Sequence, residues 1–211
     1  MQINQQSLET MTTATASEAA LSRRSIRSYA DAPIVEAELR ELTRLAARAP
    51  SAFNVQPWRF VVVRDDAMKT KLAEAAFGQP QVLRAPATIV LVSDMEDALR
   101  RLTEAMHPGM SPEKRAAGAE SVRASFANTS VEEREAWGNA QTNIALGYLL
   151  LLAESLGYAT SPMLGFDPEK VKSLLDLPAH VRITALVTIG YAAEEGFTPH
   201  RLPAESLISF R

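Results

Sequence analysis

The amino-acid sequence predicts a layered α+β or α/β domain built on a sheet of four or five strands. Segments with helical spacing of apolar residues outnumber segments rich in β-branched residues, and the predicted strands are dispersed between helices along the chain. The chain has 211 residues, of which 46% are hydrophobic, so it is long enough for one domain with a large core. We find no internal repeat and no linker that would divide it.

The first quarter of the chain predicts two helices. A short one covers residues 17–21, and a longer one covers 36–48, where leucines recur at helical spacing until Pro50 ends the pattern. A polar loop with proline at both ends follows at 50–57. Residues 58–63 then predict a buried strand.

The middle of the chain predicts one strand among several helices. Asp65 is a candidate N-cap for a helix through Ala76, and residues 78–81 read as a loop. A strand is expected at 88–93, followed by a helix over 94–106. Ser111, with proline after it, opens a charged, alanine-rich helix to about residue 127, which we interpret as a candidate lid.

The last third begins with the longest helix, at 130–156, which carries a capping box and is apolar nearly all round from Ile144 onward. We therefore expect this helix to be central and buried. The remaining elements are expected as follows: a strand at 158–161, a loop at 162–166, a helix at 167–176, a strand at 181–189 and an edge strand at 207–210.

Composition excludes several classes of function. There is no cysteine, which removes disulfides, thiolate metal sites and cysteine nucleophiles. The three histidines are far apart in sequence, so no histidine-rich metal site is expected. The formal charge of −3 and the 6% aromatic content argue against a nucleic-acid partner. Residues 1–17 lack a signal-peptide pattern and no apolar run is long enough to cross a bilayer, so we expect a cytoplasmic protein without a membrane partner.

Positive charge is concentrated in one segment, residues 23–29, which holds three arginines and two serines. A guanidinium group offers a planar fork of donors that matches a phosphate, and serine adds a compact hydroxyl. The segment is therefore a candidate phosphate site, with a solvated basic turn as the alternative that these residues alone leave open.

No catalytic motif carried by side chains is legible elsewhere. The sequence has no glycine-rich dinucleotide fingerprint, no P-loop, no Gly-x-Ser-x-Gly elbow and no His-Glu-x-x-His. If the chain is an enzyme, a bound cofactor is expected to supply the reactive atom.

Four motifs in order resemble the nitroreductase family of FMN-dependent enzymes. They are Arg23-Arg24-Ser25-Ile26-Arg27, the segment 50–58, the segment 162–167 and Arg201-Leu202-Pro203. The resemblance implies an α+β, three-layer fold with a mostly antiparallel sheet of four to five strands flanked by helices. It also implies a single domain over residues 23–211, an N-terminal extension at 1–22 with a short helix, and a variable helical excursion at about 94–137.

The resemblance assigns the arginine segment to FMN. Arg23 and Ser25 would hold the phosphate and ribityl end, with Arg201 returning from the tail. Arg24 would contribute through its backbone or through ribityl contacts. Arg27 would lie near the N1/O2 edge of the ring, where a positive charge favours reduced anionic flavin.

Other residues are implied at the flavin ring. Gln79 and Gln81 match the segment that reads the pyrimidine edge, which an amide suits because it both donates and accepts; exposed loop amides are the alternative. Gln141 matches a position near the cofactor, with an ordinary helix-surface glutamine as the alternative. The residues expected against the ring, with a backbone N–H near flavin N5, are Pro162, Met163, Leu164 and Gly165.

Part of the site is expected from a second copy of the chain. The residues that resemble the segment reaching FMN from the partner subunit are Pro50, Ser51, Ala52, Asn54 and Gln56. The resemblance therefore implies a homodimer with FMN sites at the subunit interface. It places the apolar helix near 144–153 in that interface, although without the family an intrachain core is the preferred interpretation.

Three positions depart from the family pattern. Pro199 stands where a basic residue is common two positions before Arg201, Leu164 stands where an acidic residue is frequent, and Gln81 replaces a common lysine. Fewer charges would surround the flavin, which leaves the redox potential and the substrate range open. Phe126 lies in the excursion, either as a lid aromatic that stacks on a substrate or as a helix anchor.

The expected function is that of an FMN-dependent oxidoreductase. NADH or NADPH would pass a hydride to flavin N5 and leave, and a nitroaromatic, a quinone or a related electrophile would take the electrons in the same pocket. No side chain is expected to be catalytic. The open alternatives are a same-fold enzyme with other redox chemistry (dehalogenation, aldehyde or enone reduction, flavin fragmentation) and a flavin-binding protein without turnover. An RNA- or phosphoprotein-binding module is disfavoured by the acidic balance of the chain.

Overall fold

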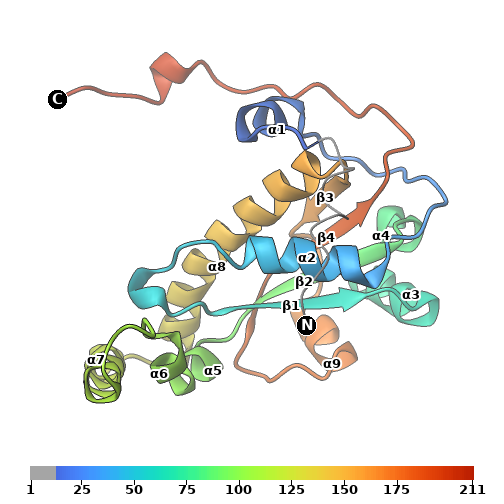
Figure 1. The fold of residues 1–211 in the computed structure, drawn as a ribbon. Helices are drawn as coiled ribbons and strands as arrows, with labels where there is room; N and C mark the ends of the chain where they lie inside the picture. The colour runs from blue at the N-terminus through green and yellow to red at the C-terminus, as the bar shows by residue number, and fades with distance from the viewer. Residues whose placement is uncertain (1–12) are drawn as a thin grey trace.

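A four-stranded antiparallel sheet forms the centre of the protein, in a computed structural model that describes residues 13–211 (Figure 1). The strand order is β1–β2–β4–β3, and every neighbouring pair is antiparallel. The bounds are β1 Trp58–Val63, β2 Ala87–Ser93, β3 Ala159–Met163 and β4 Arg182–Gly190. The predicted α+β class and antiparallel sheet are confirmed, with four strands in the described part of the chain.

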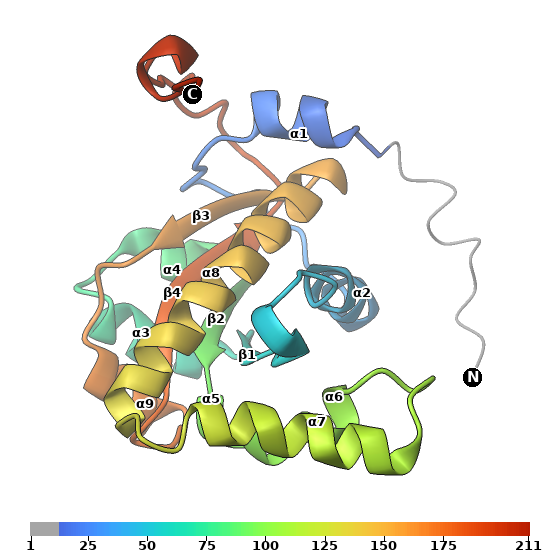
Figure 2. The same cartoon turned by 90° about the vertical axis from the view of Figure 1, so that its left-hand side faces the viewer.

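Helices α2 (Glu36–Ala46) and α8 (Val131–Ser155) cover one face of the sheet (Figure 2). Leu42 from α2 and Leu149 from α8 pack with Ile89 and Ile189 of the central strands in one buried cluster. All four side chains have no exposed surface, so this layer is a continuous apolar core. The helical spacing predicted the burial of Leu42 correctly, whereas Leu45 is only partly buried.

Helices α3 (Asp66–Ala75), α4 (Pro80–Arg84) and α9 (Pro168–Leu174) cover the opposite face. Asp65 caps α3 as expected, because its carboxylate accepts a hydrogen bond from the N–H of Met68 at 2.8 Å. The expected loop at 78–81 was partly wrong. Proline at the first position of α4 needs no hydrogen bond there, and a helix begins at that residue.

A helical lobe follows β2 and consists of α5 (Met95–Arg100), α6 (Leu102–Ala105) and α7 (Pro112–Ser125). The expected single helix over 94–106 was wrong, since two shorter helices meet at Arg101. Buried Met95, Leu102 and Phe126 give the lobe a small core of its own. The lobe stands at one end of the sheet, beside the start of α8 (Figure 1).

Helix α8 is central, as expected, but within one chain it is not buried all round. Its capping box is present, with Ser130 and Glu133 exchanging hydrogen bonds of 2.7 and 3.1 Å. One side faces the sheet, whereas Ile144, Tyr148 and Leu151 are 40, 40 and 37% exposed. The apolar residues of α8 therefore extend beyond the side of the helix that packs against the sheet of the same chain.

Helix α1 and the start of the C-terminal tail lie near the C-terminal end of α8 (Figures 1 and 2). Helix α1 (Ala16–Ser22) packs there, and the hydroxyl of Ser22 donates to Glu154 at 2.7 Å. The C-terminal tail runs past α1 and contains one short 3₁₀ turn, η3 (Ala204–Ser206). The expected edge strand at 207–210 was wrong, since those residues have no strand partner in the described chain. Residues 1–12 of the predicted extension lie outside the described residues.

None of the helices in the described range 13–211 combines the length and the apolar character needed to span a membrane.

Candidate functional site

The arginine segment is held as an extended strip beside β3. Ser25 forms a parallel bridge with Thr160, and the N–H of Ile26 donates to the Thr160 carbonyl at 3.0 Å. The hydroxyl of Tyr29 donates to the carbonyl of Ile26 at 2.7 Å and shares a hydrogen bond of 2.7 Å with the hydroxyl of Thr188. Burial raises the pKa of Tyr29 to about 12, so the phenol stays protonated and keeps the strip in place.

A second strip, residues 191–196, returns from the end of β4 and lies across the arginine segment. We call it the strap. The Nη1 atom of Arg24 donates to the carbonyl of Glu195 at 3.0 Å, and the Glu194 carboxylate accepts from the N–H groups of Arg27 and Ser28 at 2.6 and 3.0 Å. Gly196 has φ +67°, and a Cβ there would lie 2.7 Å from Cδ1 of Ile26, so any other residue would be strained at this position.

Two buried polar atoms at this site have no hydrogen-bond partner in the described chain: Nη1 of Arg23 and Oγ1 of Thr160. An orphaned guanidinium N–H is costly, because it gives up its hydration without replacement. A phosphate oxygen is an acceptor of the right kind for such a donor. The arginine segment therefore fits a phosphate-bearing ligand better than it fits a solvated basic turn.

Gln79 and Gln81 lie at the far end of β3 from the arginine segment's bridge. Gln79 donates to the carbonyl of Gly165 at 2.7 Å, and Gln81 donates to Oε1 of Gln79 at 2.9 Å. Gln81 is 4% exposed and contacts the sulfur of Met163, so the alternative of an exposed loop amide fails for it. Gly165 is exposed, and Leu164 is 77% exposed.

Strand β3 thus links two of the predicted groups, since Thr160 contacts the arginine segment and Met163 contacts Gln81. Pro162 and Met163 belong to the strand rather than to the expected loop. Arg201 is not brought to this site. It is exposed on the tail, and its Nη1 donates to the carbonyl of the preceding His200.

The segment 50–56 forms a separate polar group around the 3₁₀ turn η2 (Ala52–Asn54), and Pro50 at its start is exposed. The N–H of Ala52 donates to Oε1 of Gln141 on α8 at 3.0 Å, so that glutamine joins this group and not the arginine segment. Asn54 donates to the carbonyl of Ala105 at 2.7 Å. In Figures 1 and 2 the turn lies well away from the arginine segment.

The backbone of the turn is strained. Phe53, Asn54 and Gln56 have φ values of 55, 54 and 50°, a region that non-glycine residues seldom adopt. The hydroxyl of Ser51 accepts from the N–H of Gln56 at 3.0 Å and helps to hold the shape. Such strain clusters at functional sites, where surrounding structure enforces it.

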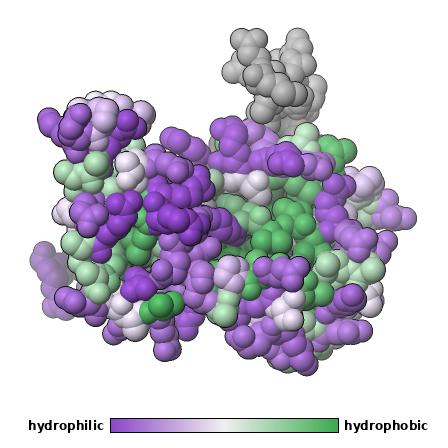
Figure 3. Space-filling model, turned by 90° about the horizontal axis from the view of Figure 1, so that it is seen from below, coloured by the Kyte–Doolittle hydropathy of each residue, from purple (hydrophilic) through white to green (hydrophobic). Residues whose placement is uncertain are grey.

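A pocket of about 440 Å³ opens beside this turn, between α2, β1 and the lobe. Val55, Trp58 and Phe60 supply apolar wall, and Arg59 and Arg101 supply charge. Seen from below, the protein has a hydrophobic hollow near its middle with hydrophilic side chains around it (Figure 3).

Phe126 is 8% exposed and packs edge-to-face against Trp137, with ring centroids 5.1 Å apart. Both rings belong to the small core of the lobe. This packing favours the helix-anchor interpretation of Phe126 over the substrate-stacking one.

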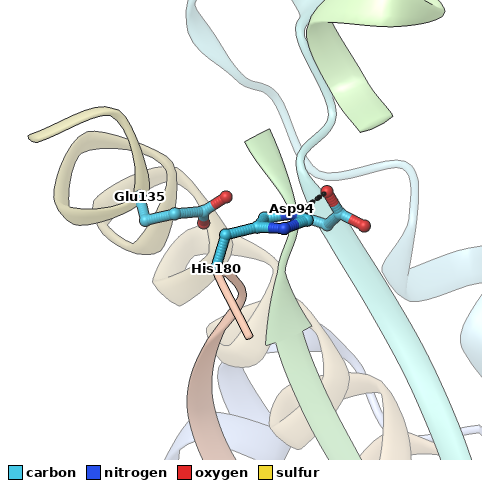
Figure 4. A group of neighbouring side chains, drawn as sticks. All are labelled: Asp94, Glu135 and His180. Carbon is cyan, nitrogen blue, oxygen red and sulfur yellow. Dashed lines mark hydrogen bonds and ion pairs between the residues drawn. The ribbon is translucent and has the colours of Figure 1, made fainter. Parts of the chain in front are cut away.

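The structure also brings together Asp94, Glu135 and His180, a group that sequence reasoning missed (Figure 4). Their ligand-type atoms lie within 4.8 Å of one another. His180 Nε2 pairs with Oδ1 of Asp94 at 3.1 Å, and Glu135 accepts from the hydroxyl of Ser93 at 2.9 Å and the N–H of Met95 at 2.7 Å. Each group already has a partner, so we interpret the cluster as a structural junction between α8, β2, α5 and the segment before β4.

The signal for this junction was weak in the sequence, because its members are distant along the chain. One clue was a glutamate in α8 five residues after its N-cap, on a face whose next members are Gly138 and Thr142. Burial raises the pKa of the Glu135 carboxyl above its usual range, against the hydrogen bonds that it accepts.

The fold and these groups define an α+β protein with an arginine-rich strip along one edge strand and a strained polar turn elsewhere. A family description, the nitroreductase family, matches residues 20–191. The NADH dehydrogenase of Thermus thermophilus is 53% identical over 193 residues, which cover 92% of this chain and 94% of that protein. The chain belongs to the nitroreductase family.

Two further relatives agree with this assignment. The putative NAD(P)H nitroreductase YdgI of Bacillus subtilis is 33% identical over 201 residues, which cover 90% of this chain and 94% of that protein. The crystal structure of a putative nitroreductase in complex with FMN, from Exiguobacterium sibiricum, has a TM-score of 0.87 at 28% identity and covers 96% of this chain and 100% of that chain.

Proposed function

We propose that this chain is an FMN-dependent oxidoreductase that uses NADH or NADPH to reduce electrophilic small molecules such as nitroaromatics and quinones. The observation that carries the proposal is the orphaned, buried Nη1 of Arg23, which lies in an arginine-rich strip beside β3 and needs an acceptor. Relatives named as NAD(P)H nitroreductases and a similar structure that holds FMN supply the identity of the ligand.

In this proposal the arginine segment binds the anionic end of FMN. Arg23 donates to the phosphate, Ser25 serves the phosphate or the ribityl chain, and Arg24 contributes near the ribityl chain. Arg24 already has one donor engaged with the strap, which suits a positioning role. Arg201 is proposed to return to the phosphate from the exposed tail.

The ring end is proposed to lie toward the other end of β3. Arg27 is exposed and available to the N1/O2 edge, where its charge stabilises negative charge on a reduced ring. The linked amides of Gln79 and Gln81 offer donors and acceptors to the pyrimidine edge. Residues Pro162, Met163, Leu164 and Gly165 are proposed to lie against the ring, with backbone N–H groups toward its N5 side.

A second copy of the chain is proposed to complete the site. The group of Pro50, Ser51, Ala52, Asn54 and Gln56, with Gln141, lies apart from the arginine segment in one chain. The partly exposed apolar row of Ile144, Tyr148 and Leu151 on α8 is the surface proposed to pair in the homodimer. Pairing through α8 would then bring the strained turn of one subunit to the flavin of the other.

When bound, FMN supplies two-electron chemistry at its N5 atom. The chain's own part is to bind and orient. The nicotinamide donor and the electrophilic acceptor use one pocket in turn, and the lobe that Phe126 anchors is proposed to border the acceptor side. No side chain is proposed as a covalent catalyst, and the proposed compartment is the cytoplasm.

The test is a visible spectrum of the purified protein, recorded without oxygen before and after NADH or NADPH is added. We expect flavin absorption bands that bleach with at least one of the two donors and return when a quinone is added. Bands that persist with both donors would support a flavin-binding protein without turnover. A protein that neither carries nor takes up added FMN would overturn the proposal.

A further inference from the structure

The strap meets the arginine segment mainly through its backbone. The N–H of Ala30 donates to the Tyr191 carbonyl at 2.9 Å, and the N–H of Ala193 donates to the Ser28 carbonyl at 3.0 Å. Among the described residues, Glu194 is the one strap residue whose side chain joins this contact. Its Oε1 atom accepts from two consecutive N–H groups, those of Arg27 and Ser28.

Those two N–H groups point the same way and would otherwise need water or an anion. A carboxylate that accepts from both makes charge-assisted hydrogen bonds, which are shorter and stronger than those between neutral groups. The bond to the Arg27 N–H is 2.6 Å long, which fits that description. The carboxylate therefore fixes the peptide plane from which the Arg27 side chain projects.

The rest of the arginine segment is held by other hydrogen bonds. Ile26 is bonded to β3, and Tyr29 is anchored by the Thr188 hydroxyl. Between these two anchors, the backbone N–H of Arg27 has Glu194 as its described partner. Arg27 is also the exposed arginine of the segment, so its packing does little to orient it.

From this geometry we infer that Glu194 is a positioning residue of the flavin site, which acts by holding the backbone of Arg27. The inference rests on the proposed function, because it assigns Arg27 to the flavin ring. If Arg27 stabilises the reduced anionic ring, loosening its backbone weakens FMN binding and makes the flavin harder to reduce.

Two substitutions separate the hydrogen bond from the charge. Glu194→Gln keeps a carbonyl oxygen that accepts from the same N–H groups but removes the negative charge. Glu194→Met keeps the length of the side chain and removes both the charge and the strong acceptor. Glu195→Met is the matched control, because the Glu195 side chain has no hydrogen bond in the described part of the chain, and only its carbonyl is used.

The dissociation constant for FMN and the midpoint potential of the bound flavin are measured for the full-length wild type and each variant. We expect Glu194→Met to weaken FMN binding by about tenfold, which corresponds to about 1.4 kcal/mol, and to shift the midpoint potential in the negative direction. Glu194→Gln is expected to stay within about threefold of the wild type in affinity, without the negative shift. Glu195→Met is expected to match the wild type in both.

Circular dichroism and thermal melting show first that each variant is folded at the assay temperature. If Glu194→Met does not fold, Glu194→Asp replaces it. The shorter carboxylate keeps the charge but does not reach both N–H groups, so it should also weaken FMN binding and lower the potential. A purely structural role would lower the melting temperature and leave the midpoint potential unchanged.

A wild-type protein that binds FMN, beside folded Glu194→Met or Glu194→Asp with unchanged affinity and potential, would overturn the inference alone. A loss as large in Glu195→Met would overturn it as well, since the effect would then belong to the strap in general. A wild-type protein that binds no FMN would overturn the proposed function, and the role of Glu194 with it.

Discussion

Glu135 on α8 accepts a hydrogen bond from the backbone N–H of Met95, 2.7 Å away, and so joins the longest helix to the first residue of α5. Its second oxygen accepts from the hydroxyl of Ser93 at the end of β2. One buried carboxylate therefore satisfies a helix N-terminus and a strand end, in a place where 3% of its surface is exposed.

Replacing Glu135 by alanine should destabilise the protein strongly. The N–H of Met95 and the hydroxyl of Ser93 would remain buried without an acceptor, at a cost of about 2–4 kcal/mol for the pair. Glu135→Gln is the matched variant, since its carbonyl accepts from Met95 and its amide donates to Ser93. Urea unfolding at neutral pH should place Glu135→Gln near the wild type and Glu135→Ala well below both. Equal midpoints for all three would contradict this assignment.

The same carboxyl predicts a pH dependence. Burial raises its pKa in the folded state, so the folded protein binds this proton more tightly than the unfolded chain does. The contribution of Glu135 to the free energy of unfolding is therefore most favourable below the ordinary pKa of a carboxyl. It becomes less favourable as the pH rises through that pKa and up to the raised value. The difference in unfolding free energy between Glu135→Gln and the wild type should change in favour of glutamine as the pH rises above about 4, the ordinary pKa of a glutamate carboxyl. A difference that is constant across this range would show that the folded environment does not perturb the carboxyl.

Gly138 lies one turn further along α8 and should not tolerate a methyl group. A Cβ there would lie 2.4 Å from Cγ of Met95 and 2.6 Å from Oγ of Ser93, so the junction would have to open. We expect Gly138→Ala to lower stability by about 1–3 kcal/mol in denaturant unfolding. Gly118→Ala in α7 is the control, because its Cβ would make only an ordinary contact with Met106, at 3.5 Å. That substitution should be neutral or stabilising, since alanine favours a helix over glycine.

Local chemistry made much of the fold predictable. The apolar, β-branched stretch that predicts a strand at 58–63 has the bounds of β1, and the capping residues Asp65 and Ser130 begin the helices they were expected to begin. These signals lie within a few residues of the structure they determine. The start of α4 at Pro80 was within reach by the same logic, because proline is favoured at the first helical position.

Tertiary neighbours were not predictable in this way. His180 meets Asp94 from 86 positions away, and neither residue carries a local sign of the other. The exposure of the row of Ile144, Tyr148 and Leu151 on α8 was not predictable for another reason. Apolar character predicts that a surface will be covered, but not which chain covers it. Gln81 and Gln141 were both expected near the cofactor, but the fold places them in separate groups. Gln81 bonds to Gln79, whereas Gln141 bonds to the 3₁₀ turn η2.

The exposed row on α8 predicts the oligomeric state. If it forms the proposed homodimer interface, Tyr148→Asp should bury a charge there and shift the protein toward monomer in analytical ultracentrifugation. Val35→Lys is the control, since Val35 is also exposed, at 54%, but lies at the start of α2. A wild-type protein that sediments as a monomer, or a Tyr148→Asp variant that remains fully dimeric, would contradict the assignment. If Tyr148→Asp loses both the dimer and the bound FMN, the result would further support a site shared between subunits.

The orphaned Nη1 atom of Arg23 predicts an asymmetric effect of ligand on stability. Arg23→Met removes a buried donor that has no described partner, so the protein without FMN should lose little stability or gain some. Because a ligand that binds only the folded state stabilises it according to its affinity, added FMN should raise the melting temperature of the wild type more than that of Arg23→Met. Arg40→Met is the control: Arg40 is exposed on α2 and pairs with Glu36 on the same helix, so FMN should protect this variant like the wild type. Equal protection of Arg23→Met and the wild type would show that this guanidinium does not contact the phosphate.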